Sequence, residues 1–495
     1  MAFVVVGGGL TGLAAAYELG RAGVPTLLLE ASERLGGKVR TDRVDGFLVE
    51  SGPDSFVSYR PAGLQLIAEL GLADQVIAPQ APRTVYIWAR DRLVPMPEGL
   101  DLVLPTKFLP FLRTPLFTLP QKARMGLDLV LPRSRWSGDM AIGAFLRRRL
   151  GPALVDRLAS PLIGGIYGTE IDELSLDAVL PQLAEAERRH RSLLLASIAS
   201  RRARSKGARA KASGGGASGG GASGGGGPSP APFVTLAGGT GALVEALVEA
   251  IARLPSVEVR TGAPVEAVEL AASGSVSHPT RGSVRLGRGE VVPFDGLVLA
   301  TPAPVSASLL EPSVPAVAPP LRSILYGSTA VVTLAYDERE FEATEAGHGF
   351  LVAGDAGLSI SAGTISSRKW AGRAPAGGVL VRAFLGDGAG ALLAAPDDAL
   401  VAAVQADLSR AIGLRGEPLF SRIARWPGAM PHYIVGHLER VAAAEAALAD
   451  RPSVALAGSA YRGVGLPDCV GQGRAAARRV LEAVGGEVAR SAAAR

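Results

Sequence analysis

The stretch that decides the fold is residues 2–30, AFVVVGGGLTGLAAAYELGRAGVPTLLLE. The apolar run at residues 2–6 predicts a short buried strand, and residues 11–22 have the apolar spacing of a helix. Residues 25–30 predict a second strand. The order strand, glycine turn, helix, strand predicts a βαβ unit at the start of the chain.

Three glycines follow the first strand in the spacing Gly7-x-Gly9-x-x-Gly12. Without side chains, they let a pyrophosphate approach backbone N–H groups at a helix N-terminus. Glu30 ends the second strand, where a carboxylate accepts hydrogen bonds from a ribose hydroxyl. The pattern therefore favours a dinucleotide site over a glycine turn in some other α/β protein.

Composition narrows the class of protein further. The 495 residues carry 48% hydrophobic and 20% charged side chains, typical of a globular protein of about two or three domains. The net charge of +5 gives little support for a nucleic-acid partner. Cys469 is the one cysteine, which excludes an intrachain disulfide and argues against a metal site. No secretory signal is visible, so we expect a cytoplasmic protein, with the inner face of the cell membrane as an alternative location.

A second glycine pair suggests which dinucleotide binds. Residues 33–38, ERLGGK, follow the second strand, and nicotinamide enzymes do not usually carry such a loop. This Arg-x-Gly-Gly loop resembles that of the FAD-dependent amine oxidase superfamily. Residues 295–302, DGLVLATP, resemble a further flavoprotein strand, with Pro302 in place of the usual glycine. FAD is therefore the expected cofactor.

Three later segments sharpen the resemblance. They are SPLIGGIY at 160–167, the stretch from Arg425 to His437, and YRGVGLPDC at 461–469. Together they are very similar to the FAD-dependent porphyrinogen oxidases of haem biosynthesis, which act on protoporphyrinogen or coproporphyrinogen III. His432 departs from the glutamine common in that family.

The resemblance implies an α/β (α+β) fold with a Rossmann-like FAD-binding domain assembled from discontinuous segments. A mixed antiparallel-sheet substrate domain and a mostly helical, membrane-facing domain would complete it. We expect the FAD-binding domain to combine residues 1–85, 233–302 and 433–495. Residues 86–205 would form the helical domain, 206–232 a disordered Gly/Ser-rich insert, and 303–432 the substrate domain.

The resemblance also implies site residues. The expected FAD contacts are Gly7, Gly9, Gly12, Glu30, Gly37, Lys38, Gly52, Ser55, Val265, Trp426, Val464, Gly465 and Leu466. A backbone carbonyl at Gly165 would act in catalysis, and Arg83 would bind a substrate propionate. Leu351, Ile365 and Phe384 would pack against the macrocycle. The alternatives are a plain turn at Gly165, an exposed arginine, and core packing for the apolar residues and Trp426.

The implied activity is oxidation of a porphyrinogen to the porphyrin in three two-electron steps, with dioxygen as acceptor. Other flavin amine oxidases, carotenoid desaturases, and a non-catalytic carrier of FAD or porphyrin are the alternatives. The apolar, proline-interrupted residues 100–119 cannot form a spanning helix and could either rest on a membrane surface or form a buried helical hairpin. A homodimer is left open.

Overall fold

The computed structural model describes residues 1–101, 103–134, 136–200, 202, 231–271, 281–341, 347–354 and 356–493. Apart from its last two residues, the predicted insert at 206–232 lies outside this portion of the chain.

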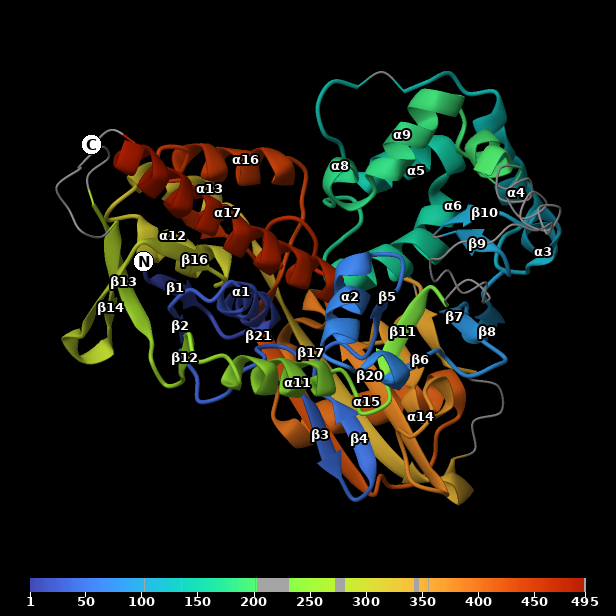
Figure 1. The fold of residues 1–495 in the computed structure, drawn as a ribbon. Helices are drawn as coiled ribbons and strands as arrows, with labels where there is room; N and C mark the ends of the chain where they lie inside the picture. Colours follow the sequence, from blue (N-terminus) through green and yellow to red (C-terminus); the bar gives the residue numbers. More distant parts are fainter. Residues whose placement is uncertain are drawn as a thin grey trace, which may run out of the picture.

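The chain opens with the predicted unit: strand β1, helix α1 and strand β2. These strands lie in a five-stranded parallel sheet in the order β12-β2-β1-β16-β22. The five strands come from three distant stretches of the sequence, which confirms the discontinuous Rossmann-like domain (Figure 1). The bounds are β1 Phe3–Val6, α1 Leu10–Arg21, β2 Thr26–Leu29, β12 Val257–Arg260, β16 Gly296–Leu299 and β22 Val454–Leu456.

Both faces of this sheet are buried at its centre, where every residue of β1, β2 and β16 is buried and Thr26 is the one polar side chain among them. Val5 packs toward one set of helices, and its neighbours Val4 and Val6 pack into a separate core on the other face. The first face is covered by α1, α2 (Pro61–Glu69), α11 (Gly241–Ala252) and α17 (Leu466–Ala493). The second is covered by β13 (Val265–Leu270), β14 (Gly282–Leu286), β15 (Val291–Phe294), α12 (Ala303–Leu310), α13 (Ala318–Arg322) and α16 (His437–Ala447).

A second, seven-stranded sheet has the strand order β21-β17-β20-β19-β18-β7-β8. All its neighbours are antiparallel except the parallel pair β18 and β7. Helix α15 (Asp397–Ile412) packs into the core on one face. The bounds are β7 Val85–Ala89, β8 Arg92–Pro95, β17 Tyr326–Asp337, β18 Gly349–Val352, β19 Ala362–Ile365, β20 Gly378–Leu385 and β21 Phe420–Pro431.

The helical region lies at the upper right of Figure 1, on the other side of the molecule from α16. It contains α3 (Phe108–Arg113), α4 (Leu119–Gly126), α5 (Ile142–Leu150), α6 (Pro152–Leu154), the π-helix η3 (Val155–Gly164), α7 (Gly165–Tyr167), α8 (Leu176–Val179) and α9 (Pro181–His190). Among the described residues, no helix has the length and apolarity needed to cross a bilayer.

Two features of this region differ from the expectation. Residues 85–95 form a hairpin that joins the seven-stranded sheet, because Arg90 and Asp91 adopt positive φ angles and turn the chain back after an apolar strand. Residues 100–105 form a two-stranded pair, β9 (Leu100–Asp101) and β10 (Leu104–Pro105), where a helical hairpin was one alternative.

Candidate active site

The opening glycines make a tight turn around the start of α1. Gly7 has a φ of +105°, and its N–H donates to the Leu29 carbonyl at 2.7 Å. A Cβ at Gly12 would overlap the carbonyl oxygen of Gly7, so only glycine allows the helix to start this close to the strand. No side chain in the described residues caps the first turn of α1, which leaves its N–H groups available to an anion.

Glu30 lies beside this turn, as predicted. Its carboxylate accepts hydrogen bonds from Gly8 N–H at 2.6 Å and from Ser32 N–H at 2.9 Å. Its backbone carbonyl accepts from Ala263 N–H at 2.9 Å, two residues before Val265. Val265 therefore lies near Glu30, although the two are far apart in the sequence.

The second glycine loop folds back on the first. Gly36 N–H donates to Gly8 carbonyl at 2.8 Å, and a Cβ at Gly37 would lie 3.1 Å from the Gly9 Cα. The Arg34 guanidinium donates to the carbonyls of Leu35, Val39 and Gly37 and so holds the loop in shape. The arginine of the Arg-x-Gly-Gly motif is thus a structural clamp.

Residues 51–55 and strand β21 close the next side of the site. A Cβ at Gly52 would overlap the Lys38 carbonyl oxygen, so the two segments touch through their backbones. Trp426 donates from Nε1 to the Ser51 carbonyl at 2.9 Å, and Lys38 donates to the Ala429 carbonyl. Burial lowers the pKa of Lys38, so a nearby anion would stabilise its charged form.

The C-terminal segment reaches the same place. A Cβ at Gly473 in α17 would overlap the carbonyl oxygen of Thr11 in α1, so these helices cross in direct contact. The turn with Val464 and Gly465 leads into α17, which begins at Leu466. The N-termini of both helices therefore belong to one site, and the chemistry of this cradle fits FAD: glycine turns for the pyrophosphate and a carboxylate for the ribose.

A buried charge cluster lies under the site. Asp54 is 3.1 Å from Lys369 Nζ and 3.5 Å from Arg382 Nη1, and it accepts from Trp370 Nε1 at 3.2 Å. Burial pushes the pKa of Asp54 upward, but the charges of Lys369 and Arg382 outweigh burial and leave that pKa below its usual range. Arg382 also donates to the Gly52 carbonyl at 2.6 Å, which ties the substrate sheet to the FAD domain. Sequence reasoning missed this cluster, although an arginine inside the apolar strand GVLVRAFL was a signal.

The depressed pKa of Asp54 predicts a pH effect. A carboxylate with a lowered folded-state pKa stabilises the fold above the pKa of about 4 that it has when unfolded, and the contribution is lost as the pH falls through the folded-state value. Asp54→Asn should therefore lower the melting temperature at pH 7 and flatten its decline below about pH 4. Melting curves from about pH 3 to pH 7 measure this, with the exposed Asp450→Asn as control. An unchanged pH profile for Asp54→Asn would contradict the assignment.

The seven-stranded sheet presents one of its faces next to these residues. Leu351 and Phe384 both pair with Ala362, so the three side chains lie in one row on one face. Phe384 pairs in turn with Val331 on β17. The pairing of β17 with β21 shifts between Gly327 and Thr329, and beyond this shift Thr329 pairs with Trp426. Thr329 is two residues from Val331, so Thr329 and Trp426 lie on this same face. We call this the substrate face.

The helical region lies over the substrate face. The π-helix η3 packs against β18 and β7, and a Cβ at Gly168 would lie 3.4 Å from Met430 and 3.8 Å from Thr329. In the sequence, Gly165 lies between η3 and Gly168, and a Cβ built on Gly165 would have no atom within 4 Å. π-Helices are often found at functional sites. The predicted catalytic segment thus faces the strands that carry Leu351 and Trp426.

Two predicted substrate residues have a different placement. Ile365 pairs with Val381, which points to the opposite face from Phe384, and Ile365 is 1% exposed. Its side chain is a core residue here, because one residue of offset along a strand reverses the face. Arg83 precedes β7, and its guanidinium lies 5.6 Å from the centre of the Phe233 ring. Its contact with a propionate remains a prediction.

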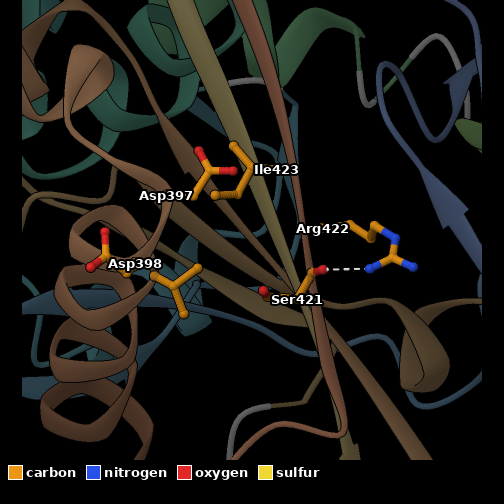
Figure 2. A pocket seen from close by; sticks show the side chains of 6 residues that line it. Asp397, Asp398, Ser421, Arg422 and Ile423 are labelled. Carbon is orange, nitrogen blue, oxygen red and sulfur yellow. Dashed lines mark hydrogen bonds between the residues drawn. The ribbon is translucent and has the colours of Figure 1, made fainter.

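A separate groove of about 400 Å³ lies between α15 and β21, where Asp397, Val401 and Ile423 line it. Ile423 pairs with Val332, on the face opposite Trp426. Figure 2 shows Arg422 pointing away from Asp397 and Ile423, on the other side of the strand. This groove is therefore separate from the substrate face.

The geometry defines a class of protein. A two-helix dinucleotide cradle next to an apolar sheet face describes an FAD-dependent oxidoreductase. Residues 10–481 match the family of flavin-containing amine oxidoreductases. The chain belongs to this family, and the resemblance drawn from its motifs is confirmed.

Comparison with individual proteins gives a more specific likeness than the family does. The chain is 51% identical to the coproporphyrinogen III oxidase of Propionibacterium freudenreichii subsp. freudenreichii, over 97% of this chain and 90% of the relative. It is 34% identical to the coproporphyrinogen III oxidase of Bacillus subtilis (strain 168), over 97% of each chain. A crystal structure of a protein assigned as a protoporphyrinogen oxidase from Exiguobacterium sp. 255-15 aligns with a TM-score of 0.80 and 34% identity, covering 96% of this chain and 98% of that one.

Proposed function

We propose that this enzyme oxidises a porphyrinogen to the porphyrin in haem biosynthesis, and that coproporphyrinogen III is the preferred substrate. The observation that carries the proposal is the apolar row of Leu351, Ala362 and Phe384 on one sheet face next to the FAD cradle. A macrocycle needs such a surface, and an elongated or small cationic amine does not. The 51% identical relative named for coproporphyrinogen III supports the choice of substrate.

In this mechanism the residues of the chain bind FAD and the porphyrinogen and orient them relative to each other. Bound FAD supplies a two-electron acceptor. The substrate face holds the macrocycle from one side, and the segment with Gly165 covers the other side and excludes water. In this proposal the carbonyl of Gly165 accepts a hydrogen bond from a pyrrole N–H, and Arg83 pairs with a propionate. Six electrons and six protons leave the substrate in three rounds, and dioxygen becomes hydrogen peroxide.

A paired assay tests the proposal. The purified yellow protein is mixed in air with coproporphyrinogen III or protoporphyrinogen IX, and porphyrin fluorescence and oxygen uptake are recorded. We expect both to be oxidised, with kcat/KM at least about tenfold higher for coproporphyrinogen III. Oxidation of amines without porphyrin formation would indicate a different amine oxidase. Bound FAD that no porphyrinogen reduces without oxygen would indicate a carrier.

The helical region supports a second proposal, contact with a membrane surface. Leu109, Leu112, Leu119 and Val130 are exposed on neighbouring elements of this region, with Lys107 close by. Exposed leucines next to basic residues are typical of proteins that rest on anionic lipid.

Sedimentation with anionic vesicles tests this contact. The triple variant Leu109→Ser, Leu112→Ser and Leu119→Ser should sediment several-fold less than the unaltered protein. Val291→Ser is the matched control, because Val291 is similarly exposed but lies on the FAD domain. Equal sedimentation of the triple variant and the unaltered protein would contradict membrane contact through this region.

A further inference from the structure

Two buried side chains hold the turn between β22 and α17. Tyr433 Oη donates to the Ser459 carbonyl at 2.8 Å and accepts from Gly463 N–H at 2.7 Å. His437 Nε2 is 2.9 Å from the Tyr461 carbonyl. Residues 459, 461 and 463 are thus each fastened through the backbone, immediately before the Val464-Gly465 turn of the FAD cradle.

The two side chains act as a unit. Their rings stack with centroids 3.8 Å apart and an interplanar angle of 16°. Burial lowers the pKa of His437 to about 4, so the imidazole is neutral at physiological pH. Since the Tyr461 carbonyl can only accept, Nε2 must carry the proton. Burial also raises the pKa of Tyr433, so its hydroxyl keeps its proton.

The same short segment is bound to the helical region through its backbone. Ser175 N–H donates to the Tyr433 carbonyl at 2.8 Å, and Val435 N–H donates to the Glu173 carbonyl at 2.9 Å. Gly436 N–H donates to Asp139 at 2.8 Å. The ring of Tyr167, two residues after Gly165, lies 5.7 Å from that of Tyr433. The segment therefore contacts the helical region with its backbone and the FAD turn with its side chains.

We propose that Tyr433 and His437 are positioning residues that fix the C-terminal FAD turn relative to the helical segment carrying Gly165. Neither side chain needs to touch the flavin or the substrate for this role. Their hydrogen bonds set the path of residues 459–463, and small shifts in a supporting segment misplace the groups that bind a ligand. This role does not depend on the identity of the substrate.

Four variants test the proposal on the FAD-loaded protein. Tyr433→Phe removes both hydrogen bonds of the hydroxyl and keeps the ring. His437→Leu removes the donor to the Tyr461 carbonyl, and His437→Gln keeps an N–H donor at a similar reach. Tyr336→Phe is the control, because it removes the hydroxyl of another buried tyrosine, in the seven-stranded sheet. The readouts are the FAD dissociation constant, the visible flavin spectrum and the flavin midpoint potential.

We expect Tyr433→Phe and His437→Leu to weaken FAD binding about tenfold and to shift the visible bands and the potential. His437→Gln should stay close to the unaltered protein, and Tyr336→Phe should match it. If Tyr433→Phe and His437→Leu only lower the melting temperature and leave FAD affinity, spectrum and potential unchanged, the proposal is wrong. If Tyr433→Phe does not fold, the comparison of His437→Leu with His437→Gln decides. All readouts are measured on the flavin, so they test this proposal independently of any assay with porphyrinogens.

Discussion

Gly12→Ala is expected to yield a protein that purifies without flavin and binds added FAD at least about a hundredfold more weakly. The added Cβ would overlap the carbonyl oxygen of Gly7, which is backbone and cannot move aside without opening the turn. The first N–H groups of α1 would then no longer point at one anion site. The visible absorbance of the purified protein and a fluorescence titration with FAD measure the effect.

Gly9→Ala separates damage to the turn from blockage of the site. Gly9 has a φ of −70°, which alanine adopts readily, and a Cβ there meets no protein atom within 4 Å. This variant should keep the melting temperature of the FAD-free protein and still lose FAD, because the methyl group occupies space that the pyrophosphate needs. Gly485→Ala, in an open position of α17, should bind FAD normally. Full FAD affinity in Gly9→Ala would place the pyrophosphate elsewhere.

Arg149→Met is expected to be the most destabilising single change in the helical region. Arg149 and Asp128 are fully buried and 2.5 Å apart, and Arg149 also lies 3.2 Å from Glu187, which is 2% exposed. The guanidinium donates in addition to the carbonyls of Pro132 and Arg191. Removing it leaves two buried carboxylates without their cation, which costs about 3–5 kcal/mol.

Thermal unfolding followed by circular dichroism measures this loss. We expect the first transition to fall by about 5 °C or more. Arg188→Ala is the matched control, because its partner Glu185 is exposed and surface pairs contribute little. The FAD domain has its own core, so FAD should remain bound below the first transition. A melting temperature within about 1 °C of the unaltered protein would contradict a structural role for the buried cluster.

Short-range features could be predicted well. The strands, turn and helix of residues 2–30 appear within a residue or two of their expected bounds. These elements depend on apolar spacing and glycine geometry, which are local properties. The same holds for the family resemblance, which rests on short motifs and which the relatives confirm.

The face of the seven-stranded sheet on which each side chain lies could not be predicted in the same way. Leu351, Ile365 and Phe384 look alike in sequence, yet the strand register puts Ile365 on the opposite face from the other two. The role of Arg382 could not be predicted, because its partners, Asp54 and the Gly52 carbonyl, lie in a distant segment of the chain.

The nucleotide cradle could be predicted from the sequence alone, because Gly7 needs a positive φ and Gly12 lies against the carbonyl oxygen of Gly7. Which side chains share the substrate face, and which segment holds the C-terminal turn, became known from the folded structure. Those choices depend on hydrogen bonds between strands and loops far apart in the chain, and a one-residue change in pairing reverses the face on which a side chain lies.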